Sequence, residues 1–168
     1  MSERKRFDRE LFEKYDKAAR EATKKYFERI SNGVSYDSEG NVHDCGVTFK
    51  VEEHPDRYAQ DLIVTRNDFY NDGHWDQSKF NVECEVKRVW KEEKFPYDSV
   101  QLPQRKEKFC DGNTVFFIWN EPMTHAAVFE DEVIKDLTPI EVPNKYMYKD
   151  EYFFQIPLDK VDFISVDS

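Results

Sequence analysis

One predicted strand constrains the fold more than any other segment, because its two faces differ in character. Residues 81–90 read Asn-Val-Glu-Cys-Glu-Val-Lys-Arg-Val-Trp, and successive side chains of a strand point to opposite faces. One face is apolar and consists of Val82, Cys84 and Val86. The other face is charged and consists of Glu83, Glu85 and Lys87. The pattern predicts a strand that packs one side on a core and places Glu85 beside Lys87 on the other.

The remaining patterns predict a single α/β domain over residues 1–168. Residues 7–31 have apolar side chains at helical spacing, and Asn32-Gly33 is a stop signal. Strands are predicted at 47–52, 60–66, 80–90, 114–119, 125–129 and 151–158. Residues 67–79 are polar and are typical of an inserted hairpin, while Pro103 can open a short helix that runs to Phe109. We therefore expect a central mixed sheet, one long N-terminal helix and flanking helices.

Charge and composition limit the classes of partner. The net charge of −10 argues against a general nucleic-acid coat protein, because phosphate binding depends on clustered Lys and Arg. Residues 87–108 nevertheless carry seven basic and four acidic side chains, a local net charge of +3. The sequence has no apolar run of about 20 residues, so no membrane span is expected. Its three cysteines include no Cys-x-x-Cys pair, which predicts a reducing, cytoplasmic location.

Asp61 is a candidate partner for the charged strand. It precedes the apolar residues Leu62, Ile63 and Val64, which predict a buried strand. Two carboxylates about 4 Å apart repel by roughly 4 kcal/mol at an effective dielectric near 20, so a cation or a proton must offset them. Magnesium prefers oxygen ligands and needs only one or two carboxylates. The simpler alternative is a same-face Glu85–Lys87 ion pair worth about 0.2–1 kcal/mol. Asp76, nine residues before Glu85, competes with Asp61.

The order of helix, strand, Asp61 strand, Glu85-x-Lys87 strand, basic segment and apolar strand resembles the PD-(D/E)XK nuclease superfamily. This family includes restriction endonucleases, archaeal Holliday-junction resolvases and phage nucleases. The resemblance covers roughly residues 15–120, with Gln60-Asp61 in place of the Pro-Asp of the family. It implies a restriction-endonuclease-like sheet and Mg²⁺- or Mn²⁺-dependent hydrolysis of DNA phosphodiester bonds.

The resemblance also implies roles for individual residues. Asp61, Glu85 and the backbone carbonyl of Val86 would bind the metal, and Lys87 would orient or help deprotonate the nucleophile. The family often adds an acid from the first helix, and Glu21 lies at the edge of the apolar helix stripe. Glu28 is the alternative to Glu21. Glu83 shares the face of Glu85. It either lies outside the direct ligands of the metal, binds a second metal, or is exposed toward the end of the strand, and the last of these is the expectation.

A positive segment beside such a site would attract a phosphate backbone. The residues expected to contact DNA are Arg88, Lys91, Gln104, Arg105 and Lys106. Many members of the family act as dimers, so a homodimer is an open option. The alternative function is a non-catalytic nucleic-acid-binding or adaptor protein on the same fold. If the chain is virus-encoded, the expected location is the host cytoplasm. The sequence does not determine which DNA structure is the substrate, or whether the nucleic acid is DNA or RNA.

Overall fold

The computed structural model describes residues 9–31, 46–56, 58–70, 72–142 and 151–166. Its regular elements are α1 (Arg9–Ile30), β1 (Gly46–Glu53), β2 (Leu62–Phe69), β3 (Trp75–Lys87), β4 (Ser99–Pro103), β5 (Thr114–Asn120), β6 (His125–Glu130), β7 (Ile140–Val142), β8 (Glu151–Pro157) and β9 (Asp162–Ser165). Three short 3₁₀ helices complete them: η1 (Gln104–Phe109), η2 (Asp131–Ile134) and η3 (Leu158–Lys160).

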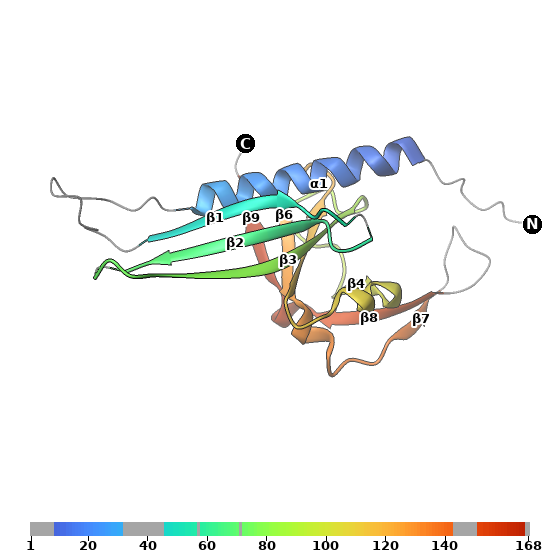
Figure 1. The fold of residues 1–168 in the computed structure, drawn as a ribbon. Helices are drawn as coiled ribbons and strands as arrows, with labels where there is room; N and C mark the ends of the chain where they lie inside the picture. Colours follow the sequence, from blue (N-terminus) through green and yellow to red (C-terminus); the bar gives the residue numbers. More distant parts are fainter. Residues whose placement is uncertain (1–8, 32–45, 57, 71, 143–150, 167–168) are drawn as a thin grey trace, which may run out of the picture.

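The long N-terminal helix is confirmed. It runs along one face of the large sheet (Figure 1) and buries Ala19, Thr23 and Phe27, which lie four residues apart. At its C-terminal end, the backbone N–H and the Oγ of Ser31 both donate to the carbonyl of Phe27, at 3.1 and 2.9 Å. The predicted stop at Asn32-Gly33 lies outside the described residues.

The central sheet is mixed, as expected. Its six strands lie in the order β1-β2-β3-β5-β6-β9, with β3 and β5 parallel and the other neighbours antiparallel. A parallel pair needs a crossover, and here residues 88–113 provide it, with β4 and η1 inside. The prediction of a short helix ending at Phe109 is confirmed by η1.

The predicted hairpin over residues 67–79 belongs to two strands that are longer than expected. β2 and β3 pair from Leu62↔Val82 to Phe69↔Trp75, so β3 begins at Trp75. The connecting turn has Gly73 at φ 87°, a region that glycine adopts without strain. Residues 66–70 and 72–80, called the arm below, extend beyond the end of β5 (Figure 1).

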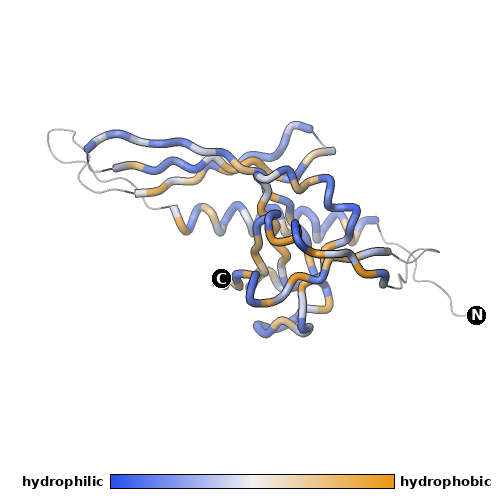
Figure 2. Tube along the Cα trace, turned by 90° about the horizontal axis from the view of Figure 1, so that it is seen from below, coloured by the Kyte–Doolittle hydropathy of each residue, from blue (hydrophilic) through white to orange (hydrophobic). Residues whose placement is uncertain are grey.

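Apolar side chains pack on both faces of β3 and β5. Between the sheet and α1 lie Val82, Cys84, Phe117 and Trp119. On the other face, Phe116 and Ile118 pack with residues of the second sheet such as Phe154. β5 is thus buried on both faces, as its continuous apolar sequence predicts. In Figure 2 the hydrophobic segments gather toward the centre of the molecule.

The expected flanking helices are where the fold differs from the prediction. A three-stranded sheet, β4-β8-β7, and short 3₁₀ turns cover the face opposite α1. Within the described ranges, α1 is the one α-helix. The segment after β3 contains Pro96 and Pro103, which disfavour a long helix, and Ser99–Pro103 pairs with β8 instead.

Candidate carboxylate and lysine site

Asp61 lies directly beside the charged strand. The pairing of β2 with β3 ends at Leu62↔Val82, and the Asp61 Oδ2 then accepts a hydrogen bond of 2.9 Å from the Cys84 N–H. The preceding residue fixes this position: the buried Gln60 donates from Nε2 to the Phe109 carbonyl at 3.2 Å and to the Thr114 Oγ1 at 3.0 Å. The Asp61 carboxylate is therefore placed against β3 between Glu83 and Glu85.

Glu83 is the acid nearest to Asp61, and the expectation that it is exposed is wrong. Its side chain is only 5% exposed, because it lies on the sheet face covered by the second sheet and η1. It is hydrogen-bonded to Asp61, and its Oε2 accepts a hydrogen bond of 2.6 Å from the Lys106 Nζ. Burial, the hydrogen bond to Asp61 and the charge of Asp61 raise the pKa of Glu83 to about 8, against the opposing effect of Lys106. The Glu83 carboxyl group is therefore largely protonated near neutral pH.

Lys106 reaches this cluster from η1, and its side chain is 19% exposed. Burial alone would lower the pKa of Lys106. The negative charges of Glu85, Glu83 and Asp61 outweigh that effect, so the pKa is raised and the ammonium group is retained. Lys106 was expected to contact DNA; in this structure its ammonium lies among the carboxylates.

The acid that α1 brings to the site is Asp16, which sequence reasoning missed. Both helix candidates, Glu21 and Glu28, are exposed. Asp16 is half-buried, and burial together with the charge of Asp61 raises its pKa, against the effect of its ion-pair partner Arg20. A signal for it exists in the sequence, since Asp16 precedes the buried Ala19 and Thr23 by three and seven residues.

Glu85 and Lys87 lie farther along the same face of β3 and are half-buried. Burial lowers the pKa of Lys87, and the neighbouring Glu85 only partly opposes this shift. The Lys87 Nζ also lies 5.1 Å from the centre of the Tyr97 ring. Val86 packs toward α1, as strand alternation predicts. Asp76 is exposed on the arm, where it is paired in register with Asp68 rather than with the site.

The other predicted DNA contacts are exposed. Arg88 lies 5.2 Å from the centre of the Tyr15 ring, and Lys91 forms an ion pair with Glu121 at 3.5 Å. Gln104 and Arg105 lie on η1, next to Lys106. Among the predicted contacts, Lys106 reaches the carboxylates, with its Nζ 2.6 Å from the Glu83 Oε2.

The donor atoms at this site suit a hard divalent cation. Carboxylate oxygens of Asp61, Glu83 and Glu85 are the ligands that Mg²⁺ and Mn²⁺ prefer. No cluster of three or more His, Cys, Asp or Glu side chains in the described part of the chain is arranged to hold a metal ion. A cation site here would therefore rest on fewer side chains, with backbone carbonyls or waters as further ligands.

No family model, curated protein or solved structure matches this chain. Among the described helices, none has the length and apolar character needed to cross a membrane.

Proposed function

We propose that the chain is a Mg²⁺- or Mn²⁺-dependent endonuclease that hydrolyses DNA phosphodiester bonds at the Asp61–Glu83–Glu85 cluster. The observation that carries the proposal is the contact of the Asp61 carboxylate with the Cys84 N–H, between two glutamates of the same strand face. The order α1, β1, β2, β3 and β5, with β3 and β5 parallel, adds support through its resemblance to PD-(D/E)XK nucleases.

The metal would be held by Asp61 together with Glu83 or Glu85, and by the carbonyl of Val86 if the family geometry carries over. When bound, a divalent cation supplies positive charge for the transition state and lowers the pKa of a bound water. Lys87 would serve at its Nζ as a donor to the phosphate or as a proton acceptor. Its lowered pKa brings it closer to the range in which a lysine can exchange a proton.

The test is cleavage of plasmid, branched and single-stranded DNA with Mg²⁺ or Mn²⁺, and then with EDTA. Asp61→Asn keeps an acceptor for the Cys84 N–H, so the fold should survive while metal binding weakens. Lys87→Ala should reduce cleavage by about 10²–10⁴-fold, the usual contribution of a positioned acid or base. Glu28→Gln, on the exposed face of α1, is the matched control and should cleave like the parent chain.

Full activity of both Asp61→Asn and Lys87→Ala would contradict the proposed site. Activity that persists in EDTA would contradict the role of a metal.

A specific observation favours a second candidate, a non-catalytic binding or adaptor protein. The Lys106 ammonium, 2.6 Å from the Glu83 Oε2, already gives the cluster a cation of its own. If Lys106 stays in this position permanently, the cluster is a structural element and no metal enters. Isothermal titration of Mn²⁺ and a DNA mobility-shift assay distinguish the cases. Metal binding with cleavage supports the enzyme, retarded DNA without cleavage supports a nucleic-acid binder, and neither effect supports an adaptor.

A further inference from the structure

The arm presents a strand edge that is not paired with another strand of the described residues. β5 pairs with β3 only over Asn81–Lys87, and no other described strand lies along Trp75–Phe80 on the side away from β2. The Asn81 N–H donates toward that side, to the Asn113 carbonyl at 2.9 Å. Because backbone groups alternate along a strand, those of Trp75, Gln77 and Lys79 are directed to the same edge. At Lys79 the carbonyl already accepts a hydrogen bond of 3.0 Å from the Asn113 Nδ2, so the stretch of edge offered to a second strand is centred on Trp75 and Gln77. Such an edge is a template for another strand.

We propose that this edge pairs with the same edge of a second copy of the chain, antiparallel, with Gln77 opposite its counterpart. In this register Trp75 lies opposite Lys79 of the second copy, and Asp76 lies opposite Ser78. No like charges face one another. Centring the pairing on Asp76 or on Lys79 would instead place identical charges in contact, which destabilises a strand pair.

Side chains of the arm suit this register. The Asn67 Nδ2 donates to the Thr48 Oγ1 at 3.5 Å, and the Gln77 Nε2 donates to the Asn67 Oδ1 at 3.0 Å. These bonds form a polar ladder across β1, β2 and β3 that reaches the open edge at Gln77. A primary amide has both donors and an acceptor, so two Gln77 side chains can bond one another and continue the ladder into the second copy.

The surroundings of the edge favour a protein rather than a nucleic acid. The arm carries Asp68, Asp72 and Asp76 against Arg66 and Lys79, a net charge of −1, so it lacks the cluster of basic side chains that phosphate binding needs. Trp75 is 53% exposed, although it stacks on Phe69. In the proposed pairing, Trp75 of each copy would lie beside Lys79 of the other copy, a pair suited to a cation–π contact.

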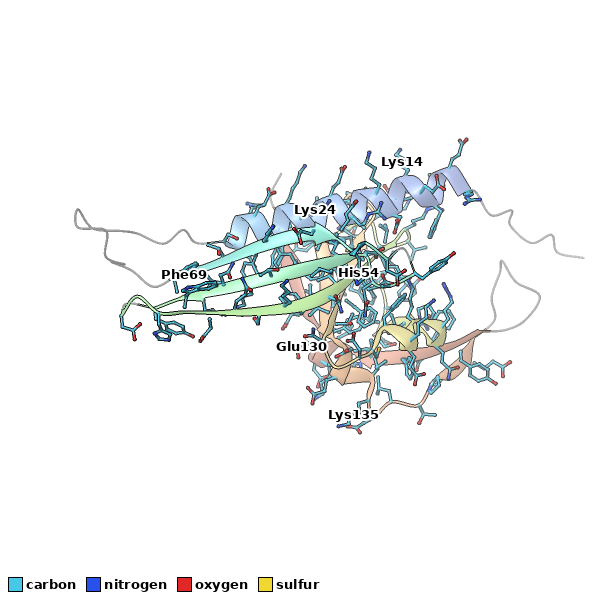
Figure 3. All side chains as sticks on the ribbon, in the orientation of Figure 1. Lys14, Lys24, His54, Phe69, Glu130 and Lys135 are labelled. Atoms are coloured by element: carbon cyan, nitrogen blue, oxygen red, sulfur yellow. The ribbon has the colours of Figure 1, made fainter. Side chains whose placement is uncertain are left out.

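A groove of about 1220 Å³ lies next to Lys79, where the end of the second arm would arrive. Its lining includes Lys79 from the arm, and Glu130 and Lys135 from the body of the molecule. Figure 3 shows Phe69 out on the arm, away from these two body residues. The groove therefore leaves room for the partner's turn at the base of the arm.

Disulfide trapping tests the register. In an antiparallel hydrogen-bonded pair the two Cα atoms are about 5.5 Å apart, a separation that a disulfide spans. Gln77→Cys should therefore form a covalent dimer under mild oxidation, and a reductant should reverse it. Lys50→Cys places a thiol at an exposed position of β1, the opposite edge of the sheet. This variant should cross-link no more than the parent chain, and preferential cross-linking through Lys50→Cys would overturn the proposal.

Sedimentation equilibrium tests the dimer itself, which needs no catalytic activity. The parent chain should show twice its mass of 20.2 kDa at high micromolar concentration. Gln77→Pro removes one N–H from the edge, a change that an edge strand tolerates, and should weaken association at least tenfold. Gln77→Ala keeps that N–H and should weaken association less. A monomeric parent chain at 200 μM, or a Gln77→Pro variant that associates like the parent chain, would refute the pairing.

Discussion

The protonation of Glu83 gives the sharpest prediction, and the variant that tests it is Glu83→Gln. The side chain of Glu83 is 5% exposed, and its pKa is raised from 4.5 to about 8, first by burial and then by Asp61. A folded-state pKa above the unfolded-state value means that the native chain binds more protons than the unfolded chain at intermediate pH. The stability that this proton provides is complete below about pH 4.5 and is lost as the pH rises toward 8.

The magnitude follows from the linkage relation. Where Glu83 is protonated in the native state and ionised in the unfolded state, stability falls by about 1.4 kcal/mol per pH unit. From pH 5 to pH 8 the expected loss is about 3.5 kcal/mol, because the slope flattens as the pH approaches the native pKa. Glutamine has nearly the same shape and does not titrate, so Glu83→Gln should lack this loss. It should gain about 3.5 kcal/mol relative to the parent chain over that interval.

Urea denaturation at pH 5, 6, 7 and 8, read by circular dichroism, measures the difference in unfolding free energy between the two chains. Glu28→Gln changes an exposed side chain of the same type and should alter the free energy by less than about 0.5 kcal/mol at each pH. If the difference in unfolding free energy between the parent chain and Glu83→Gln stays constant within 1 kcal/mol from pH 5 to pH 8, the reasoning is refuted. Such a result would mean that Glu83 is ionised throughout as a simple ion-pair partner of Lys106.

Three further substitutions test parts of the fold by urea or thermal denaturation. Thr23→Val removes the acceptor of the buried Trp119 Nε1–H (2.9 Å) and should lower the unfolding free energy by about 1–3 kcal/mol; an unchanged stability would contradict the contact. Asp131→Ala removes the acceptor of the Gly112 and Thr114 N–H groups and should lower it by a similar amount. Gly112→Ala meets no atom within 4 Å, so only its φ of +85° opposes the change. Its loss should be about 1–2 kcal/mol.

Local sequence patterns were sufficient for much of the fold. Helical periodicity predicts α1, and the continuous apolar run of residues 114–119 predicts β5, because both signals depend only on which residues must leave water. Asp61 contacts β3 at the Cys84 N–H, since an acid at the start of one strand lies near the next strand of a hairpin. The convergence of the Asp61 and Glu85 carboxylates stays a prediction.

The elements that pack on the face of the large sheet opposite α1 could not be predicted in the same way. Glu83 and Glu85 are indistinguishable in an alternating pattern, yet only Glu83 is nearly inaccessible to solvent. The difference arises because η1 and the second sheet fold over one part of β3, and this packing brings together residues distant in sequence. Lys106, for example, is 23 residues away from Glu83.

The helix acid was missed for a related reason. Glu21 borders the apolar stripe of the helix, whereas Asp16 is half-buried on the same helix face as Ala19 and Thr23. A rule that treats only apolar residues as buried cannot find an acid whose burial is supported by Arg20 and Lys106. Both cations lower the pKa of Asp16 and so reduce the penalty of burying its charge.

The charges of the complete cluster link the proposed function to a measurable quantity. Its acids are Asp16, Asp61, Glu83 and Glu85, and its bases are Arg20, Lys87 and Lys106. The outer pair of Glu53 and Lys24 beside Arg20 adds no net charge. With Glu83 protonated, these groups sum to zero near pH 7. A divalent cation that displaced this proton would leave the cluster with a net charge of +1, which favours an anionic phosphate. Metal binding at this site must then release about one proton per ion. Calorimetry of Mn²⁺ binding in buffers with different ionisation enthalpies measures that number, and binding without proton release would place the metal elsewhere.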